Sequence, residues 1–507
     1  MKKLNKYKSQ IYFHLIVNSL VGVFITFSSY YHLPLNYISD YSIYFIHFII
    51  LQFTVYGFLY LLSINKYLFY LTFPVLFFIY ALFSYWVYVQ DISISYSIVQ
   101  PVIESKLDIA LDLITTPFII YSLIALLIII YILKLYRNLR VDQLKSPLLI
   151  LALIAIATFY GLNKHGIGNL KWRMPYNLTY GFIEYFNKPI VHYKKVNTNI
   201  VNKENDINIV FVLGESVRAK NLGINGYSRN TTPQLKKINN LISFPNVYTP
   251  LTYTGISVPQ ILSNKSIYKE QNSSNLFSIY SILNKVNFTT SWIGNQTPEK
   301  SYSFFIDEND NIEFIDQFHD VFSFQKKLDE EMLPFLESKI KNGTKNFITL
   351  HMIGSHWWYE ARYSKKYRKY TPVIDSKHIP ALSNEQIINS YDNTILYLDN
   401  FLNNVIHKIK KSKSKTILIY LSDHGEILGE NGKWLHAQGD DASTNPAMFI
   451  WYSDSFKQTY PEKIKNLQLN ASKQITTDFF FHSILDLIEI QNFNYEKSQS
   501  IFEIVKN

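Results

Sequence analysis

The sequence predicts a protein in two parts: an N-terminal bundle of five membrane-spanning helices and an α/β domain with a mostly parallel central sheet flanked by helices. Two observations predict this fold class. Long apolar runs with almost no charge fill residues 1–165, and short β-rich apolar runs alternate with polar helical stretches from about residue 207 onward. We therefore divide the chain into a transmembrane domain (1–165), a bridging segment (166–205) and an outer domain (206–507).

The overall composition excludes several classes of protein. The chain has 507 residues, a formal net charge of +10, 48% hydrophobic residues and no cysteine. This hydrophobic content is not that of a disordered chain or of an all-membrane transporter. The absence of cysteine excludes a disulfide scaffold, a thiolate zinc site and a cysteine nucleophile.

Five apolar runs are each long enough to cross a hydrocarbon core of about 30 Å. We expect the spans at residues 11–29, 41–62, 67–88, 116–134 and 146–163. The first run lacks a small-residue cleavage site and four more follow it, so we interpret it as an uncleaved span and not as a signal peptide. In the bridging segment, Trp172–Tyr185 is aromatic and amphiphilic and fits either an interfacial helix or a plain linker.

The distribution of charge predicts the orientation of the spans, because loops rich in lysine and arginine stay in the cytoplasm. The N-terminus is therefore expected inside and everything after about residue 165 outside. Residues 1–164 hold 11 basic and 6 acidic residues, so half of the net charge is a topology signal and no nucleic-acid partner is expected. The basic positions are Lys2, Lys3, Lys6, Lys8, Lys66, Lys134, Arg137, Arg140 and Lys145, and the alternate loops carry Asp40, Asp91, Glu104, Asp108 and Asp112 with Lys106.

The outer domain contains short apolar runs that each fit a buried strand. They are Ile207–Leu213, Phe288–Ile293, Asn346–His351, Thr416–Leu421 and Pro446–Tyr452. Their alternation with helical stretches predicts a mostly parallel sheet, in which functional residues collect beyond the carboxyl ends of the strands.

Carboxylates, histidines and hydroxyls follow these runs, and together they are typical of a metal site. The residues are Glu215, Thr254, Ser257, His351, His356, Asp423, His424 and His436. Oxygen and nitrogen ligands of this kind suit Zn²⁺, with Mn²⁺ or Mg²⁺ as weaker candidates. A divalent metal neutralises the charge of a phosphate ester and activates a hydroxyl, so that a threonine or serine can attack phosphorus while histidine and lysine stabilise oxygens and protonate the leaving group.

Three long motifs in the outer domain carry a family resemblance. They are residues 214–218 (GESVR) with 223–233 (GINGYSRNTTP), residues 254–259 (TGISVP), and residues 422–432 (SDHGEILGENG) with His436. These resemble the opening, nucleophile and metal-and-histidine motifs of bacterial phosphoethanolamine transferases, in the alkaline phosphatase/sulfatase superfamily. The resemblance covers the whole chain. It implies a sulfatase-like catalytic domain in the periplasm, anchored in the inner membrane of a Gram-negative bacterium.

The resemblance implies one zinc ion held by Glu215, Thr254, Asp423 and His424. Thr254 is then the nucleophile that carries phosphoethanolamine as an intermediate. The resemblance also implies that two further histidines bind phosphate oxygens, assist proton transfer or help to hold a second zinc ion. These histidines are His356 and His436.

Residues 292–300 (WIGNQTPEK) resemble a family motif whose amide and lysine contact the substrate. This implies substrate-binding roles for Asn295, Gln296 and Lys300, although Gln296 stands where the family usually has asparagine. His351 also matches a family histidine, and it fits a hydrogen-bonded core residue equally well.

The implied reaction is a two-step transfer. Phosphatidylethanolamine donates phosphoethanolamine to Thr254, diacylglycerol leaves, and a phosphate or hydroxyl of lipopolysaccharide, in lipid A or in the core, accepts the group. The chain is expected to act as a monomer among membrane lipids. The added ammonium weakens the attraction of cationic peptides to the cell surface, so polymyxin tolerance is expected if lipid A is the acceptor.

The sequence departs from the family pattern at three points. It has no cysteine where relatives often carry several disulfides, which implies another source of stability. His356 is followed by Trp357 and Trp358 where Gly-Pro is common, which we expect to alter the rim of the site. Gln260 stands where cysteine is frequent.

Three other functions compete with this interpretation. Ser257-Val-Pro259 resembles the start of the sulfatase signature but lacks its arginine, so a sulfatase or phosphodiesterase stays an alternative. Glycerophosphate transfer of the lipoteichoic-acid-synthase type resembles this chain in its spans and outer domain. A non-enzymatic membrane scaffold is the third alternative, although all the residues of the implied zinc site are present.

Overall fold

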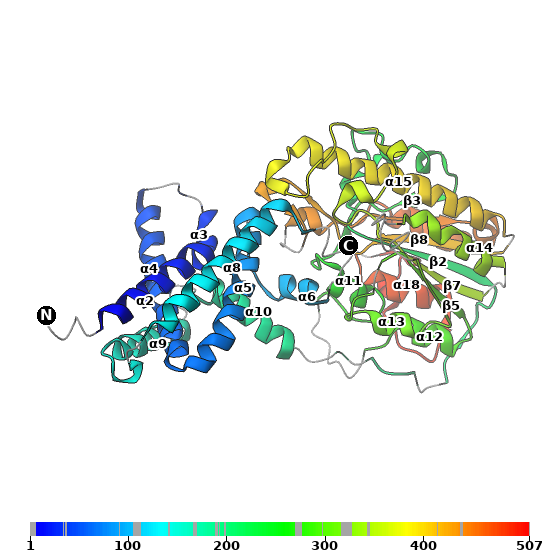
Figure 1. Ribbon diagram of the computed structural model, residues 1–507. Helices are drawn as coiled ribbons and strands as arrows, with labels where there is room; N and C mark the ends of the chain where they lie inside the picture. The colour runs from blue at the N-terminus through cyan, green and yellow to red at the C-terminus, as the bar shows by residue number, and fades with distance from the viewer. Residues whose placement is uncertain are drawn as a thin grey trace. The chain divides into compact units, whose positions relative to one another are not determined.

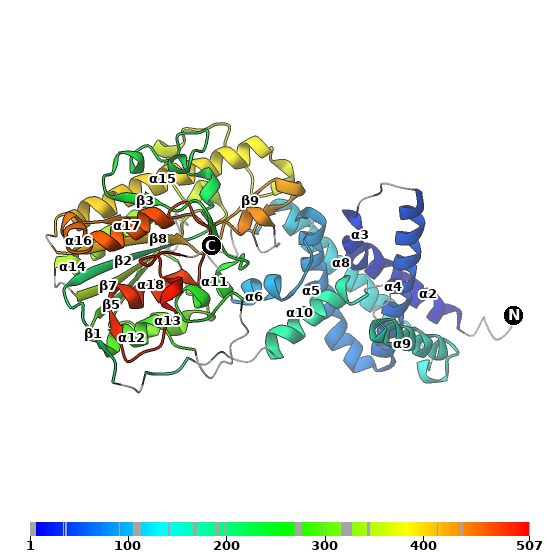
Figure 2. The ribbon, with the colours of Figure 1, turned by 180° about the vertical axis from the view of Figure 1, so that it is seen from behind.

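The structure is a computed structural model that describes residues 7–505, apart from 34, 36–37, 91, 105–112, 140–141, 166–169, 188–190, 192, 197–198, 269–275, 297, 316–326, 342–344, 413 and 437–439. The chain forms two compact units (Figures 1 and 2). The first comprises residues 1–103, 113–188 and 378–380, and the second comprises residues 104–112, 189–377 and 381–507. Several residues of the orientation argument lie outside the described residues: Lys2, Lys3, Lys6, Asp91, Lys106, Asp108, Asp112 and Arg140.

The described part of the first unit consists of helices and their connections. Four apolar helices are long enough to cross a membrane: Lys8–Thr26, Ile38–Ile64, Lys66–Gln90 and Thr116–Arg137. A fifth apolar helix, α9 (Leu148–Lys164), has 17 residues and is about 26 Å long, which is short of the roughly 30 Å hydrocarbon core. Four of the five predicted spans are thus confirmed by length and composition, and the count of five is not. The unit's helices are α2 (Lys8–Val21, continued by a π-helical turn at Gly22–Thr26), α3 (Ser28–Tyr31), α4 (Ile38–Ile64), α5 (Lys66–Gln90), α6 (Tyr96–Glu104), α8 (Thr116–Arg137), α9 and α10 (Tyr176–Asn187).

The four long helices leave most of their apolar surface uncovered by protein. Between 17% and 44% of each apolar window is buried inside the unit, and Leu71 and Leu127 are well exposed. Exposing so much apolar surface to water is unfavourable, so these helices require lipid around them. Some polar groups inside the unit are paired with one another, as where the Gln143 amide binds the side chain and the carbonyl of Ser63 at 2.7 and 2.8 Å.

The second unit is organised around a seven-stranded sheet in the order β3-β11-β8-β2-β7-β5-β6. Strands β8, β2, β7, β5 and β6 are parallel, whereas β11 is antiparallel to both of its neighbours. The bounds are β2 (Ile207–Gly214), β3 (Leu241–Ser243), β5 (Thr289–Gly294), β6 (Asn311–Phe314), β7 (Lys345–His351), β8 (Thr416–Ser422) and β11 (Met448–Tyr452). Short pairs outside this sheet are β1 (Val201–Asn202) with β13 (Ile490–Gln491), β4 (Val247–Tyr248) with β12 (Ile475–Thr476), and β9 (Ile427–Leu428) with β10 (Trp434–Leu435).

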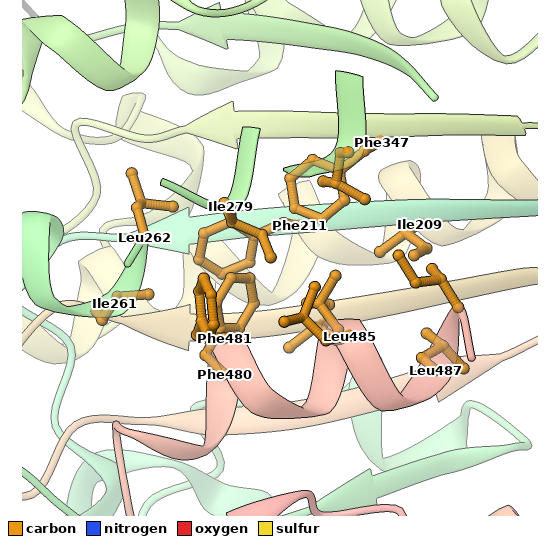
Figure 3. Close-up of a cluster of buried hydrophobic side chains, with 14 of the residues drawn as sticks. Ile209, Phe211, Ile261, Leu262, Ile279, Phe347, Phe480, Phe481, Leu485 and Leu487 are labelled. Carbon is orange, nitrogen blue, oxygen red and sulfur yellow. The ribbon is translucent and has the colours of Figure 1, made fainter. Parts of the chain in front are cut away.

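Helices cover both faces of this sheet, with α14 and α15 on one side and α12, α13 and α18 on the other (Figures 1 and 2). Helix α15 begins with a capping box in which Ser383 and Gln386 satisfy each other's backbone amides. On the opposite face, the α18 residues Phe480, Phe481 and Leu485 pack against Phe211 of β2 (Figure 3), and the Phe211 and Phe480 rings lie 4.1 Å apart. The unit's helices are α11 (Thr254–Ile261), α12 (Ile279–Lys285), α13 (Ser303–Asp307), α14 (Leu333–Lys341), α15 (Asn384–Lys410), α16 (Asp454–Thr459), α17 (Pro461–Asn470) and α18 (Phe479–Leu487).

All five predicted strands are present and pair in the one sheet, which confirms the predicted α/β class. The register places the site, because Gly214 at the end of β2 pairs with Ser422 at the end of β8, and Leu213 pairs with His351 at the end of β7. The chain therefore leaves three adjacent parallel strands at one edge. Glu215, Met352 and Asp423 are the residues that follow these strands.

Candidate active site

Glu215, Asp423 and His424 converge where β2 and β8 end, and all three are buried. His424 Nε2 lies 3.4 Å from Glu215 Oε1 and 3.3 Å from Asp423 Oδ2. One ligand atom from each residue lies within 4.8 Å of the other two, which is the spacing of a metal-binding group. The sequence argument placed these residues at the ends of neighbouring strands, and the structure brings them together.

The backbone beside these carboxylates is held in an uncommon conformation. Ser216 has φ of +59°; its amide donates to Asp423 Oδ1 at 3.2 Å and its hydroxyl to Glu215 Oε1 at 2.7 Å. Gly354, with φ of +52°, lies so close that a Cβ there would be 2.7 Å from the Glu215 carbonyl oxygen. A glycine is therefore required at position 354, and Ser216 fixes the orientation of both carboxylates.

Thr254 lies against the same group, at the first position of helix α11. Its hydroxyl donates to Glu215 Oε2 at 2.9 Å, and its side chain is almost fully buried. The amides of the first helical turn have no partners within the helix, so this position favours a negatively charged group. By contrast, the Ser257 hydroxyl one turn later donates to the backbone carbonyls of Leu251 and Tyr253, both at 3.0 Å.

Two buried atoms of this group have no protein partner among the described residues: Asp423 Oδ2 and His424 Nε2. An unpaired buried polar atom costs roughly 1–3 kcal/mol. The two atoms converge with a Glu215 oxygen, and carboxylate and imidazole are ligands of Zn²⁺. The residues present therefore fit a divalent cation.

The charges of the two carboxylates are strongly unequal without such a cation. Burial raises the pKa of both groups, but His424, His356 and His436 outweigh it at Glu215 and lower that pKa to about 2. At Asp423 the Glu215 charge adds to the effect of burial and holds the pKa well above its usual range. A bound cation would allow both carboxylates to be ionised.

The three histidines of the site all present the same ring nitrogen. The Nδ1 atom of each is bound to an oxygen that only accepts: the Gly425 carbonyl for His424, at 2.7 Å, the Trp357 carbonyl for His356, at 2.6 Å, and the Glu426 carboxylate for His436, at 2.9 Å. Nδ1 must therefore carry a hydrogen, so Nε2 is the ring nitrogen that is left to bind a metal or to exchange a proton. Burial lowers the pKa of His356 to about 4.

A second group with metal-ligand spacing adjoins the first and consists of His424, Glu426 and His436. Both oxygens of its carboxylate already have partners, because Glu426 accepts from His436 on one oxygen and from the Tyr359 hydroxyl, at 2.7 Å, on the other. The rings of His436 and His356 lie 5.9 Å apart, and those of His436 and His424 lie 4.6 Å apart. The structure thus places both predicted histidines next to the Glu215 group.

The predicted substrate-binding residues after β5 have different surroundings. The Gln296 amide donates to Glu215 Oε2 at 3.3 Å, whereas the Asn295 amide donates to Asp329 at 2.8 Å. Asp329 in turn accepts from the backbone amide of Ile353, so Asn295 contacts a structural carboxylate. The Lys300 side chain is exposed.

His351 lies at the end of β7 and is buried against aromatic rings. Its ring centroid is 5.2 Å from that of Trp292 and 5.5 Å from that of Tyr302. Neither ring nitrogen has a hydrogen-bond partner among the described residues, so the alternative of a hydrogen-bonded core residue does not describe it. Burial lowers its pKa to about 4.

Trp357 and Trp358 stand where Gly-Pro is common in the family, and the Trp357 ring is buried. Trp357 is 2% exposed and packs on Tyr359, with the ring centroids 5.0 Å apart. The carbonyls of His356 and Trp357 accept from the Arg362 guanidinium at 2.9 and 2.8 Å. The tryptophan at position 357 therefore changes the packing next to His356.

Two carboxylates near the site were not assigned from the sequence: Glu426 and Glu299. Glu426 lies two residues after His424 within the motif at residues 422–432, and its place in that motif could have identified it as a site residue. Glu299 directly precedes Lys300 in the substrate-contact motif. Its burial, with 8% of its surface exposed, has no signature in the sequence.

Comparison with known proteins places this geometry in context. Residues 207–490, over half of the chain, match the family described as Sulfatase. The phosphoethanolamine transferase EptA of Escherichia coli strain K12 is 32% identical over 305 residues, which is 58% of this chain and 55% of that protein. The chain spans about half the length of the curated relatives it matches.

Two solved structures share the fold. The integral membrane protein lipooligosaccharide phosphoethanolamine transferase A (EptA) from Neisseria meningitidis matches with a TM-score of 0.85 at 24% identity, over 96% of this chain and 97% of that chain. The periplasmic domain of EptC from E. coli, solved in complex with Zn, matches with a TM-score of 0.54 at 21% identity, over 62% of this chain and 92% of that one. At these identities the matches show the fold alone.

Proposed function

Because this chain belongs to the sulfatase family, we propose that it is a membrane-bound, zinc-dependent phosphoethanolamine transferase with its catalytic domain, residues 206–507, in the periplasm. The proposed donor is phosphatidylethanolamine and the proposed acceptor is lipopolysaccharide. The names of the similar proteins support this choice over other activities of the family. The apolar helices support an anchor in the inner membrane, where the donor lipid lies within reach.

One observation carries the proposal: the Thr254 hydroxyl lies 2.9 Å from Glu215, beside two buried ligand atoms that lack a partner. A hydroxyl held against a cation site is the arrangement that nucleophilic attack on a phosphate ester requires. Ser257, the alternative nucleophile, has its hydroxyl committed to two backbone carbonyls. This difference favours Thr254 and disfavours the sulfatase alternative.

Glu215, Asp423 and His424 would hold the zinc ion together with Thr254. Zinc, when bound, would neutralise phosphate charge and lower the pKa of the Thr254 hydroxyl. The E. coli domain of the same fold that was solved with zinc supports this choice of metal. The structure offers the donor set of one ion, and the neighbouring histidines leave room for the alternative of two.

The residues around the nucleophile have separable tasks in the proposed reaction. Thr254 Oγ1 forms a bond to the donor phosphorus while the bond from phosphorus to the diacylglycerol oxygen breaks, and that oxygen takes up a proton. His356 and His436 present their Nε2 atoms to phosphate oxygens and to this proton transfer. Gln296, which contacts Glu215, and the exposed Lys300 bind the substrate, and His351 packs against Trp292 at the start of the same motif.

In the second step, a phosphate or hydroxyl of lipopolysaccharide attacks the phosphothreonine and releases Thr254. The bond between phosphorus and Thr254 Oγ1 breaks and Thr254 regains its hydrogen, which regenerates the free enzyme. The proposed enzyme acts as a monomer. The acceptor gains an ammonium group, which weakens the binding of cationic peptides such as polymyxin when lipid A is modified.

Mass spectrometry of lipopolysaccharide tests the proposal. A Gram-negative host that lacks its own transferases should gain one phosphoethanolamine on lipid A or core when it expresses the wild-type chain, and none with Thr254→Ala. Ser257→Ala is the matched control and should retain the modification. Modification by Thr254→Ala, or an added glycerophosphate, would contradict the proposal.

A further inference from the structure

A single buried carboxylate beside the site has no cation of its own. Glu299 lies in the loop after β5, is 8% exposed, and receives one long side-chain hydrogen bond, 3.4 Å from the Ser301 hydroxyl. No lysine, arginine or histidine among the described residues pairs with it, and the adjacent Lys300 points into solvent. Buried carboxylates are almost always paired, so this one calls for a partner that the described residues do not supply.

The loop that carries Glu299 is fixed at both ends. Gln296 donates to Glu215 at 3.3 Å, and the Glu299 carbonyl accepts from the amides of Tyr302 and Ser303 at the start of α13. Three residues span at most about 11 Å, so the backbone of Glu299 lies within that distance of the residue that touches the Glu215 group. Glu299 is therefore close in the chain to the residue that contacts the Glu215 group, and 8% of its surface is still exposed.

The electrostatic surroundings of Glu299 favour a cation. Burial, followed by the charges of Glu215, Glu104 and Asp423, raises the pKa of Glu299 to about 8. An ionised Glu299 is therefore unfavourable until a positive charge is brought next to it. A ligand that carries one would relieve the repulsion and the cost of burial together.

We propose that Glu299 binds the protonated amine of the donor headgroup and so selects phosphoethanolamine over headgroups without a cation. The inference rests on the proposed function, since the amine is two methylene groups from the phosphate that Thr254 attacks. An ammonium group can form a charge-assisted hydrogen bond with the largely buried Glu299 carboxylate. A polar headgroup without charge leaves that carboxylate without a counter-charge. Selectivity then comes from the penalty on the wrong headgroup as much as from the attraction of the right one.

Binding of two small probes to the full-length, zinc-loaded protein in detergent tests the inference without catalysis. Phosphoethanolamine and n-propyl phosphate differ in that a methyl group replaces the ammonium. Calorimetry should show phosphoethanolamine binding at least about tenfold more tightly to the wild type, a difference of about 1.4 kcal/mol. In Glu299→Gln the two probes should bind within about twofold of each other, with zinc content unchanged.

Two further variants keep the test decisive. Glu308→Gln changes another carboxyl whose pKa is raised by burial, facing Ser278 and Lys195, and it should retain the preference. Glu299→Asp retains the charge and should keep part of the preference even if Glu299→Gln folds poorly. An unchanged preference in Glu299→Gln, or the loss of a metal equivalent from it, would overturn the inference. The proposed function fails separately, if the wild type transfers nothing from phosphatidylethanolamine.

Discussion

Two carboxylate–histidine groups adjoin each other in the site, and they differ in how their polar atoms are satisfied. In the group of Glu215, Asp423 and His424, two buried ligand atoms lack any partner among the described residues. In the group of Glu426 and His436, the carboxylate accepts from His436 at 2.9 Å and from Tyr359 at 2.7 Å. Both groups have the spacing of a metal site when His424 is counted in each, but the Glu426 carboxylate already has two protein partners, whereas Asp423 Oδ2 has none among the described residues.

This difference separates a metal centre from a positioning group. A histidine that gives its Nδ1 hydrogen to a carboxylate is fixed in one tautomer and one orientation, which is the arrangement that supports a metal ligand or a proton donor from behind. We therefore assign the first group to binding the metal and Thr254, and the second to orienting His436. Substitutions in the two groups are expected to separate metal content from turnover.

The largest effect is expected from Asp423→Ala, because it removes a ligand and leaves Glu215 and His424 without their shared ion. Transfer should fall by about 10³-fold or more, and bound zinc should fall with it in metal analysis of the purified protein. Asp486→Asn is a suitable control, since Asp486 is a buried carboxylate of α18 that accepts from Ser500 at 2.7 Å and is not a member of either group. If the Asp423→Ala protein kept its zinc, Asp423 would not be a zinc ligand and the metal site would lie elsewhere.

A smaller effect is expected from Glu426→Ala, which releases His436 while the first group stays intact. Turnover should fall by about 10- to 100-fold, the usual cost of losing an outer partner of a functional histidine, with zinc content unchanged. Glu426→Gln can still accept from His436 Nδ1 and should restore part of the rate. Loss of zinc from Glu426→Ala would place the second group among the metal ligands.

Tyr359→Phe tests the outermost member of the second group. It removes one hydrogen bond from the buried Glu426 carboxylate, so thermal unfolding should show a loss of about 1.5–3 kcal/mol in stability. The rate of transfer should fall less than in Glu426→Ala. A rate as low as that of Glu426→Ala would mean that Tyr359 itself takes part in the chemistry.

The last prediction concerns the pH dependence of stability and His351, whose pKa is lowered by burial from 6.5 to about 4. The neutral ring contributes stability above pH 6.5, and this contribution is lost as the pH falls from 6.5 through 4, by up to about 3 kcal/mol. The melting temperature of His351→Gln should therefore fall less than that of the wild type between pH 7 and pH 4.5. The exposed His407→Gln should behave like the wild type, and an equal fall in all three proteins would show that His351 does not titrate in this way.

Much of the fold was predictable because strand patterns and motif positions are local. The run from Ile207 and the run from Thr416 are continuous apolar segments, and both form central strands of the sheet. Strand β6 (Asn311–Phe314) alternates between half-buried and exposed residues, which is too weak a pattern to separate it from a loop. Helix α9 is apolar but has 17 residues, fewer than the other four candidates, so the fifth span is not confirmed. The boundaries at residues 165 and 205 remain predictions.

The site was predictable where a motif places its residues at strand ends, as for Glu215 and Asp423. The orientation of side chains was not, because it depends on tertiary partners. Asn295 and Gln296 are neighbours in one motif, yet one contacts Asp329 and the other contacts Glu215. The burial of Glu299 is likewise a property of the folded loop and not of its sequence.

The central claim is that Thr254 carries the transferred group. The most direct test is mass analysis of tryptic peptides after full-length protein in detergent is mixed with phosphatidylethanolamine, in the absence of an acceptor. The peptide that contains Thr254 should gain the mass of one phosphoethanolamine, and the gain should disappear in Thr254→Ala but remain in Ser257→Ala. An adduct that persists in Thr254→Ala, or that maps to Ser257, would contradict the account.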